Sequence, residues 1–242
     1  MADRYYSAQP IAGDRITLVG PEAHHLAQVA RARPGDEVLV FDGLGSEFAA
    51  RVERVGRGEV ELAVVARREV DRELPLELSV AAALPKGDRQ RWLVEKAVEL
   101  GVTRLVPLVT TRGVAQPVEK AIDRLRRTVI EASKQCGRTR LLEIAEPQRW
   151  DELCVRQAGR RCHRAVAHPA GGEPARSLFE LLAPPRRVDS LVLAVGPEGG
   201  FTDEELAQAT AAGWSLLSLG PRVLRVETAV SCLAALVAAA SE

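Results

Sequence analysis

The chain has 242 residues, of which 46% are hydrophobic and 27% charged, and its 33 basic side chains balance 33 acidic ones. A hydrophobic share of this size supports a packed core in one large or two modest domains. The formal net charge of zero excludes a chain that attracts nucleic acid through its overall charge, so any basic patch has to be local.

The cysteines and the N-terminus bear on the compartment. The four cysteines show neither Cys-x-x-Cys spacing nor metal-like spacing with the four histidines, which favours reduced thiols and no metal. The first ten residues, MADRYYSAQP, lack the apolar core of a signal peptide. The longest apolar helix expected is about a dozen residues, too short to span a bilayer. We therefore expect a soluble, cytoplasmic protein.

Residues 1 to 72 have the pattern of a small β-rich module. Alternating runs that are typical of half-buried strands lie at Ile16–Val19, Glu37–Phe41, Glu47–Val55 and Glu59–Ala66. Glycine-containing turns separate these runs, and one helix is expected from Glu22 to Arg31. A small barrel of this kind often binds RNA, although a role in dimerisation or stability fits the composition almost equally well.

Residues 73 to 242 alternate between strand-like and helix-like segments. The predicted strands are Glu77–Leu84, Arg104–Val109, Leu141–Ile144, Ala165–Ala167, Leu191–Val195 and Ser215–Leu219. The predicted helices are Asp88–Leu100, Val118–Cys136, a short one near Asp151, Ser177–Leu182, one from Thr202 to Gly213, and Glu227–Ala240. Because alternating strands and helices form parallel sheets covered on both faces, we predict an α/β domain.

Two turns rich in glycine and proline follow the last two predicted strands, at Gly196–Gly200 and at Gly220-Pro221. Thr202, with Glu205 three residues later, predicts a capping box at the start of the helix after the first turn. We expect the two turns to end neighbouring strands and to form a cradle of main-chain atoms, the usual place for a ligand in α/β proteins. Taken alone, each turn is equally well explained as a tight connection.

The cradle does not match the common nucleotide fingerprints. The dinucleotide motif G-x-G-x-x-G would need glycine at position 198, where a glutamate stands, and no Gly-Lys-Ser/Thr completes a P-loop. The sequence therefore predicts neither a standard dinucleotide site nor a nucleoside-triphosphate site.

Basic residues are concentrated between Arg112 and Arg140, where eight stand against three acidic residues. Some of them form the solvated face of the helix that ends at Cys136, which is the ordinary explanation of a charge run. Arg138 and Arg140 lie beyond that helix, where a loop can present them to phosphates. An RNA contact there is the less common but specific alternative.

Stretches spread over the whole chain match one family. They are Arg4-Tyr5-Tyr6, His25-Leu26 through Val29 and Arg31 with Gly35-Asp36, Phe41-Asp42-Gly43, Leu84-Pro85-Lys86-Gly87, Glu95 to Val102, Glu131 to Arg138, His168-Pro169, Gly196 to Gly200 and Leu219 to Ala229. With these residues the chain resembles the RsmE group, the ribosomal RNA small subunit methyltransferase E proteins of the SPOUT superfamily. The last two stretches are specific in combination, because few unrelated proteins are expected to carry both in this order.

The resemblance implies a PUA-like, RNA-binding β-barrel over residues 1–72 and a SPOUT methyltransferase domain of α/β class over residues 73–242. It implies that the last segments of the chain thread into a trefoil knot, which the pattern of elements alone does not predict. It also implies a homodimer that transfers the methyl group of S-adenosylmethionine to N3 of a uridine in 16S ribosomal RNA.

The resemblance also assigns the site. Cofactor contacts are expected from His168, Val195, Gly196, Pro197, Glu198, Gly199, Gly200, Leu219, Gly220, Val223, Leu224, Arg225 and Thr228. RNA contacts are expected from Arg4, Arg31, Lys86, Arg112, Arg138 and Arg140.

Methylation of uracil N3 has a specific chemical difficulty, because the nitrogen carries a proton and is a poor nucleophile until it loses that proton. We assign Arg225 and Arg138 to stabilising the charge that spreads to O2 and O4. We assign Glu198 or Glu227 to orientation or to removal of the proton. Each glutamate also has a structural explanation, Glu198 as a helix cap and Glu227 as a carboxylate in the first turn of a helix.

The chain departs from the family's usual residues at a few positions. Alanines at 30 and 32 stand where leucine is usual, Thr111 stands where glutamate is usual, and Val226 removes a threonine hydroxyl beside the expected active site. Three other functions remain open: a SPOUT ribose 2′-O-methyltransferase, a non-catalytic rRNA-binding assembly factor, and a generic nucleotide-binding enzyme, which the missing phosphate motifs disfavour.

Overall fold

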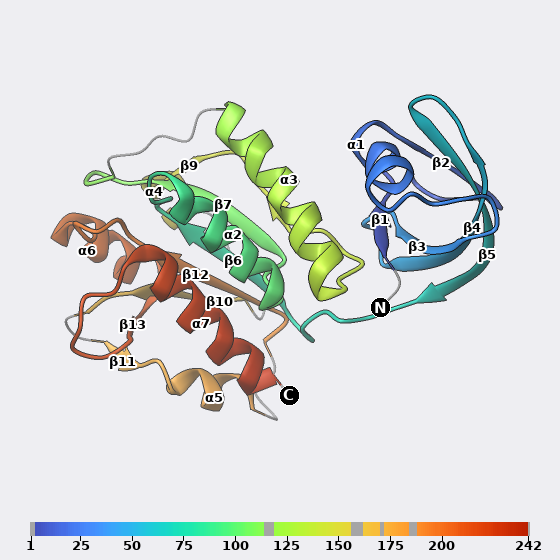
Figure 1. Cartoon of the computed structure of the whole chain (residues 1–242). Helices are drawn as coiled ribbons and strands as arrows, with labels where there is room; N and C mark the ends of the chain where they lie inside the picture. Colours follow the sequence, from blue (N-terminus) through green and yellow to red (C-terminus); the bar gives the residue numbers. More distant parts are fainter. Residues whose placement is uncertain (1–2, 114–118, 156–161, 170–171, 184–187, 242) are drawn as a thin grey trace. The chain divides into compact units, whose positions relative to one another are not determined.

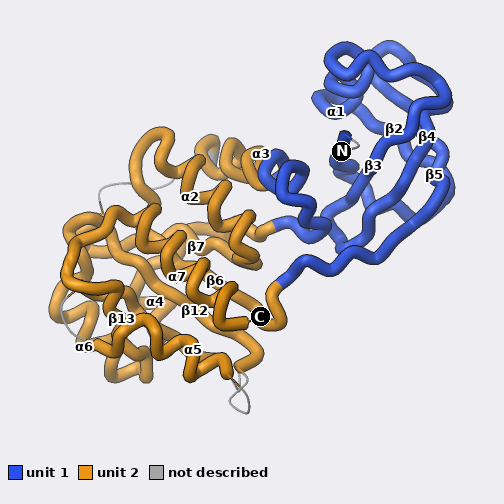
Figure 2. The backbone as a smooth tube through the Cα atoms, turned by 60° about the horizontal axis from the view of Figure 1, so that its bottom comes forward, with its two compact units in different colours: residues 1–73, 130–141 blue, residues 74–129, 142–242 orange. Residues whose placement is uncertain are grey.

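The structure is a computed structural model that describes residues 3–113, 119–155, 162–169, 172–183 and 188–241. The chain forms two compact units, which Figure 2 distinguishes by colour. The first consists of residues 1–73 together with 130–141, and the second of residues 74–129 together with 142–242. The segment 130–141, which sequence patterns place in the second domain, is therefore counted with the N-terminal unit.

The first unit is a curled five-stranded sheet (Figure 1). Its strands are β1 (Arg4–Tyr6), β2 (Arg15–Val19), β3 (Glu37–Phe41), β4 (Ser46–Val55) and β5 (Glu59–Glu69), in the spatial order β1-β3-β4-β5-β2. Apolar residues alternate with polar ones along β2, so that Ile16 and Leu18 are buried while their neighbours are exposed. The strands predicted here are confirmed, and β1, which is only three residues long, was not predicted.

The helix predicted from Glu22 to Arg31 has a different form. Helix α1 (Gly20–His24) runs into a π-helical turn, η1 (His25–Val29), and the hydrogen bond from Ala30 N to His25 O is 2.9 Å long. Arg31 follows at a φ of 56°, in the left-handed region that non-glycine residues rarely adopt. The wider turn buries Leu26 against the core and ends the helix early, at an exposed arginine.

The second unit contains an eight-stranded sheet in the order β11-β13-β10-β12-β6-β7-β8, with β9 also paired to β7. Its strands are β6 (Glu77–Ala82), β7 (Arg104–Val109), β8 (Glu143–Ile144), β9 (Gln148–Arg149), β10 (Cys162–Ala167), β11 (Glu173–Pro174), β12 (Ser190–Val195) and β13 (Ser215–Ser218). Within the described residues every pair in this unit is parallel, which confirms the predicted sheet type.

Helices alternate with these strands, and each of them buries apolar side chains. They are α2 (Asp88–Glu99), α3 (Glu119–Cys136), α4 (Trp150–Val155), α5 (Ser177–Leu182), α6 (Asp203–Ala211) and α7 (Val226–Ser241). Helix α7 packs against α2, α5, β6 and β12, while α4 and α6 pack together over a cluster that includes Trp150, Phe201 and Trp214 (Figure 1). Val118, the predicted start of the helix at α3, lies outside the described residues, and the threading of the last segments stays a prediction.

No helix among these described segments is both long and apolar enough to cross a lipid bilayer.

A buried tyrosine in the first unit predicts a pH effect. Burial raises the pKa of the Tyr5 phenol from its ordinary value of 10.0 to about 12, and its hydroxyl has no hydrogen-bond partner among the described residues. The pKa of Tyr5 is therefore higher in the folded state than in the unfolded state. For this reason its contribution to the free energy of unfolding is fully present below pH 10 and is lost as pH rises towards 12. Between pH 10 and 12 the free energy of unfolding of the parent protein should fall. In Tyr5→Phe this fall should be smaller by up to about 2.7 kcal/mol.

Urea denaturation at a series of pH values measures this effect. At neutral pH the variant is expected to stay within about 1 kcal/mol of the parent protein, because no hydrogen bond is removed. An identical loss of stability in both proteins above pH 10 would contradict the assignment to Tyr5.

Candidate functional site

A cavity of about 270 Å³ opens at the carboxyl ends of three strands of the second unit, β10, β12 and β13. All the residues predicted to contact a cofactor line it, except Arg225 and Thr228. The sequence predicts that the two glycine-rich turns end neighbouring strands, and this prediction is wrong. Strand β10 lies between β12 and β13. The inserted strand is what brings His168 into the wall between the turns.

Further residues line the cavity without having been predicted for it. They are Arg112, Ala167, Pro169, Phe201, Arg222 and Ala229. Five of them adjoin or lie between predicted residues and could have been included on that ground. Arg112 comes from the distant loop after β7, and no local pattern indicates that it meets the turns.

The conformation of the first turn favours glycine at two positions. Gly200 has a φ of 68°, and its N–H donates to Pro197 O at 2.8 Å to close the turn. A Cβ at Gly196 would lie 2.9 Å from the buried ring of Phe201. The Nη1 atom of Arg112 donates to Gly199 O at 2.9 Å and to Phe201 O at 3.4 Å, which holds the turn from one side.

The predicted capping box at α6 is confirmed, and it also positions Arg112. Thr202 Oγ1 accepts from Glu205 N at 3.2 Å, and Glu205 Oε2 accepts from Thr202 N at 2.8 Å. The second oxygen of the same carboxylate, Oε1, accepts from Thr111 N at 2.8 Å. Glu205 therefore connects the start of α6 to Thr111, the residue immediately before Arg112.

The second turn presents mostly exposed side chains. Gly220 has a φ of 100°, and its N–H donates to Ser218 Oγ at 3.2 Å. Val223 is 76% exposed, and Arg222 and Arg225 are also exposed. Val226 is buried at the first position of α7, so the one methyl group that stands in place of the usual threonine hydroxyl is enclosed by protein.

The two candidate carboxylates share one cation. Arg89 Nη1 donates to Glu198 Oε1 at 3.1 Å and lies 3.8 Å from Glu227 Oε1. The side chain of Glu198 is 54% exposed at the cavity, whereas Glu227 is buried and does not line it. The Oε2 atom of Glu227 has no hydrogen-bond partner within the described part of the chain.

Arg138 is enclosed within the first unit. Its Nε donates to Glu73 Oε1 at 3.1 Å, its Nη2 pairs with Glu73 Oε2, and its side chain is only 4% exposed. A guanidinium held by both oxygens of one carboxylate and removed from solvent is a structural group. Its position does not support the catalytic and RNA-binding roles expected for Arg138.

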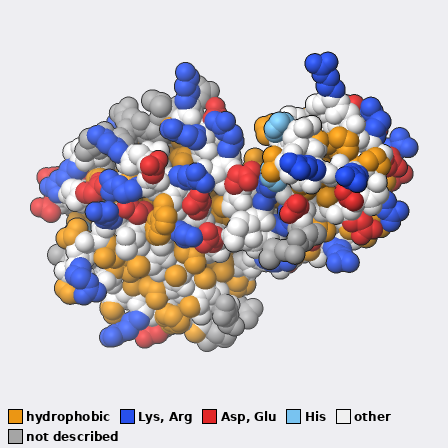
Figure 3. Space-filling view, in the orientation of Figure 1, with side chains coloured by type: hydrophobic (Ala, Val, Ile, Leu, Met, Phe, Trp, Pro, Cys, Tyr) orange, Lys and Arg blue, Asp and Glu red, His pale blue; other side chains and the backbone are white. Residues whose placement is uncertain are grey.

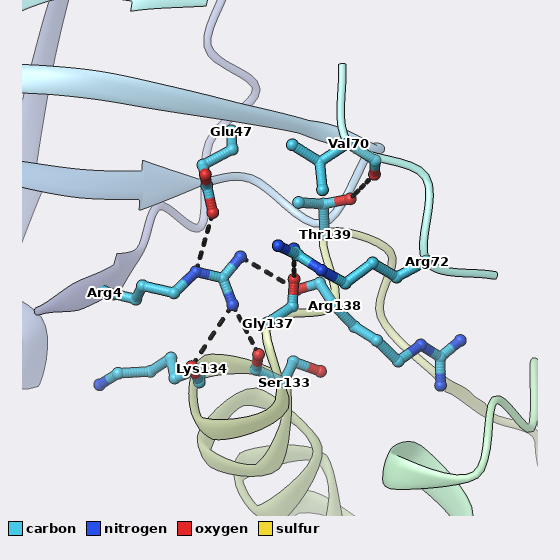
Figure 4. Close-up of polar contacts among 9 residues, drawn as sticks. All are labelled: Arg4, Glu47, Val70, Arg72, Ser133, Lys134, Gly137, Arg138 and Thr139. Atoms are coloured by element: carbon cyan, nitrogen blue, oxygen red, sulfur yellow. Dashed lines mark hydrogen bonds and ion pairs between the residues drawn. The ribbon is translucent and has the colours of Figure 1, made fainter. Parts of the chain in front are cut away.

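Arg4 has a comparable position (Figure 4). Its side chain is 8% exposed, its Nε donates to Glu47 Oε2 at 3.0 Å, and its remaining nitrogens donate to the carbonyls of Ser133, Lys134 and Arg138. Burial lowers the pKa of this guanidinium, and the neighbouring Glu47 acts in the opposite direction. Arg4 thus satisfies carbonyls at the C-terminal end of α3, which helices otherwise leave without partners.

The other arginines and the lysine expected to contact RNA are exposed. Arg31 and Arg140 lie in the first unit, and Lys86 and Arg112 lie in the second. Arg140 also packs over Gly45, where a Cβ would lie 3.2 Å from its guanidinium carbon. These four side chains remain candidates for phosphate contacts.

Both parts of the chain are similar to known RNA methyltransferases. The family model described as an RNA methyltransferase domain matches residues 72–238, and the one described as an RNA methyltransferase PUA domain matches residues 13–65. The ribosomal RNA small subunit methyltransferase E of Synechocystis is 33% identical over 214 residues, which cover 88% of this chain and 69% of that protein. The protein of the same name from Mycobacterium bovis is 32% identical over 231 residues, 94% of this chain and 87% of the relative.

Solved structures are similar over almost the whole chain. A methyltransferase from Legionella pneumophila in complex with S-adenosylmethionine has a TM-score of 0.87 and 32% identity, and the match covers 99% of this chain and 98% of the other. A ribosomal RNA small subunit methyltransferase E from Neisseria gonorrhoeae, also bound to S-adenosylmethionine, has a TM-score of 0.85 and 28% identity, with 98% and 96% covered.

Proposed function

Because this chain belongs to the RNA methyltransferase family, and within it to the ribosomal RNA small subunit methyltransferase E group, we propose that it methylates N3 of a uridine in 16S ribosomal RNA. The observation that carries the proposal is the cavity between the two turns. S-adenosylmethionine, when bound, supplies a methyl group activated by a sulfonium. We infer that the reaction takes place in the cytoplasm.

The cavity suits a cofactor of this kind. At about 270 Å³ it is close to the lower end of the range for small-molecule pockets, about 300 Å³ and above. Its walls combine apolar side chains such as Phe201 and Leu224 with main-chain atoms of the glycine turns. A Cβ at Gly196 would press the Phe201 ring, so the close approach of backbone at this point depends on glycine. We infer that the residues of both turns that line the cavity, with His168, hold the cofactor.

The chemistry on the RNA side requires proton removal and charge stabilisation. If the N3 pKa lies about two units above the working pH, forming the anion costs roughly 2.7 kcal/mol. We propose that Arg225, which is exposed at the end of the second turn, stabilises negative charge on O2 and O4. Glu198, exposed at the cavity, is the better candidate to accept or orient the proton, because the carboxylate of Glu227 is buried.

RNA binding is proposed to involve both units. Arg31 and Arg140 of the first unit and Lys86 and Arg112 of the second are exposed cations of the kind that contact phosphates. Because the net charge of the chain is zero, binding depends on such local groups and should weaken as salt is raised.

We also propose that the protein is a homodimer. Hydrophobic side chains gather over α7 and α5 on the face of the second unit in Figure 3. Trp92 is 42% exposed on α2, and α7 exposes Ala235 and Ala239 on its outer side. A contiguous apolar surface with small residues on a helix lets a second copy approach closely. Sedimentation analysis distinguishes a dimer from a monomer.

The function is tested with purified protein, S-adenosylmethionine and small-subunit RNA from a strain that lacks this gene. Digestion of the product to nucleosides is expected to give N3-methyluridine. A methylated ribose would instead identify the 2′-O-methyltransferase. Binding of RNA without binding of S-adenosylmethionine would identify a non-catalytic assembly factor.

A further inference from the structure

We propose that Arg89 is a positioning residue of the cofactor site, which ties helix α2 to both turns that form the cavity. The inference rests on the proposed function, since it concerns the same cavity. Arg89 is the second residue of α2 and does not itself line the cavity. No motif of the sequence indicates a role for it.

The contact with the first turn runs through Glu198. Arg89 Nη1 donates to Glu198 Oε1 at 3.1 Å, and Arg112 Nη1 donates to Gly199 O at 2.9 Å. The turn is thus held by two arginines from different segments, one through a side chain and the other through the main chain. With the bond from Gly200 N to Pro197 O, these contacts define where the turn lies.

The contact with the second turn runs through Glu227 in the first turn of α7. The same nitrogen of Arg89 lies 3.8 Å from Glu227 Oε1. Glu227 comes two residues after Arg225, the last residue of the second turn, and Arg225 O accepts from Ala229 N at 2.9 Å as α7 begins. Since α2 and α7 pack together, this ion pair ties the exit of the second turn to α2.

The two halves of this contact differ in strength. Glu198 and Arg89 have side chains that are 54% and 39% exposed, and ion pairs between exposed groups contribute little. The Glu227 side chain is only 9% exposed, so removing Arg89 leaves a buried carboxylate without its cation. The structure therefore assigns most of the effect of Arg89 on the cofactor site to the Arg89–Glu227 pair. The exposed Arg89–Glu198 pair makes a smaller contribution to the position of the first turn.

The test measures the affinity for S-adenosylmethionine by calorimetry and the kinetics of methyl transfer. Arg89→Met keeps the aliphatic stem and is expected to raise the dissociation constant of S-adenosylmethionine about tenfold, as the loss of a charged contact does. The KM for RNA should change by less than about twofold, because Arg89 contacts no RNA in this scheme. Arg89→Lys, which keeps the charge, should restore affinity to within about threefold of the parent.

A matched control lies on the same helix. Arg91 is 72% exposed and pairs with Glu95, so Arg91→Met removes a guanidinium from α2 without touching either turn. It is expected to leave cofactor affinity unchanged. Glu198→Gln keeps a hydrogen-bonding oxygen at the cavity and weakens only the exposed pair with Arg89, so it should raise the dissociation constant by no more than about threefold.

Several results would overturn the inference. Unchanged cofactor affinity in Arg89→Met, with or without a lower melting temperature, would show that Arg89 is only structural. A higher KM for RNA with unchanged cofactor affinity would make it an RNA contact. If Arg89→Lys did not recover the affinity for S-adenosylmethionine, the positive charge of Arg89 would not be the cause of the effect. If the parent protein itself did not bind S-adenosylmethionine, the proposed function would fail first, so the two failures are distinguishable.

Discussion

Replacing Arg138 by methionine is expected to reduce the free energy of unfolding of the first unit by about 3–5 kcal/mol. The substitution leaves Glu73, whose side chain is 13% exposed, without the guanidinium that contacts both of its oxygens. It also changes the packing beside the main chain of residue 138, whose carbonyl oxygen accepts a hydrogen bond from Arg4. Chemical denaturation followed by circular dichroism measures the loss.

Two further variants test the reason for this loss. Arg140→Met removes an exposed arginine two residues away and is expected to stay within about 0.5 kcal/mol of the parent. Adding Glu73→Gln to Arg138→Met should recover part of the stability, because no buried charge is then left unpaired. A stable Arg138→Met protein that binds cofactor normally but has lost methyl transfer would instead restore the catalytic role inferred from the sequence.

Replacing Arg225 by alanine is expected to lower kcat for methylation about 100-fold at saturating RNA and cofactor, the loss typical of removing one donor to a developing oxyanion. Arg225 is exposed, and it lies in the chain between Leu224, which lines the cavity, and the start of α7. Because Arg225 does not line the cavity itself, the dissociation constant of S-adenosylmethionine should change by less than about twofold.

Arg222 provides the comparison for this result. It is also exposed, three residues earlier, but it lines the cavity, so Arg222→Ala is expected to weaken cofactor binding more than it lowers kcat. Arg225→Lys should retain part of the rate, since it keeps the positive charge without the planar donors. Near-normal methylation by Arg225→Ala, with cofactor bound normally, would exclude Arg225 from the chemistry.

Much of the local structure could be predicted from the sequence. The capping box at the start of α6 depends on Thr202 and Glu205, which are only three positions apart. The strand alternation in the first unit and the parallel type of the second sheet follow from hydrophobic periodicity in the same way. The two turns were recognised because glycine and proline restrict the backbone at the positions where they stand.

What the tertiary structure alone decided concerns groups that are far apart in the chain. Arg4 and Ser133 are separated by 129 residues, Arg89 and Glu198 by 109, and Arg112 and Gly199 by 87. An arginine looks the same in the sequence whether it faces solvent, as Arg225 does, or is buried against a carboxylate, as Arg138 is. Which partner it meets depends on sheet order and helix packing, because these bring side chains that are far apart in the chain next to one another. For the same reason, the insertion of β10 between β12 and β13, which puts His168 beside both turns, has no local signal.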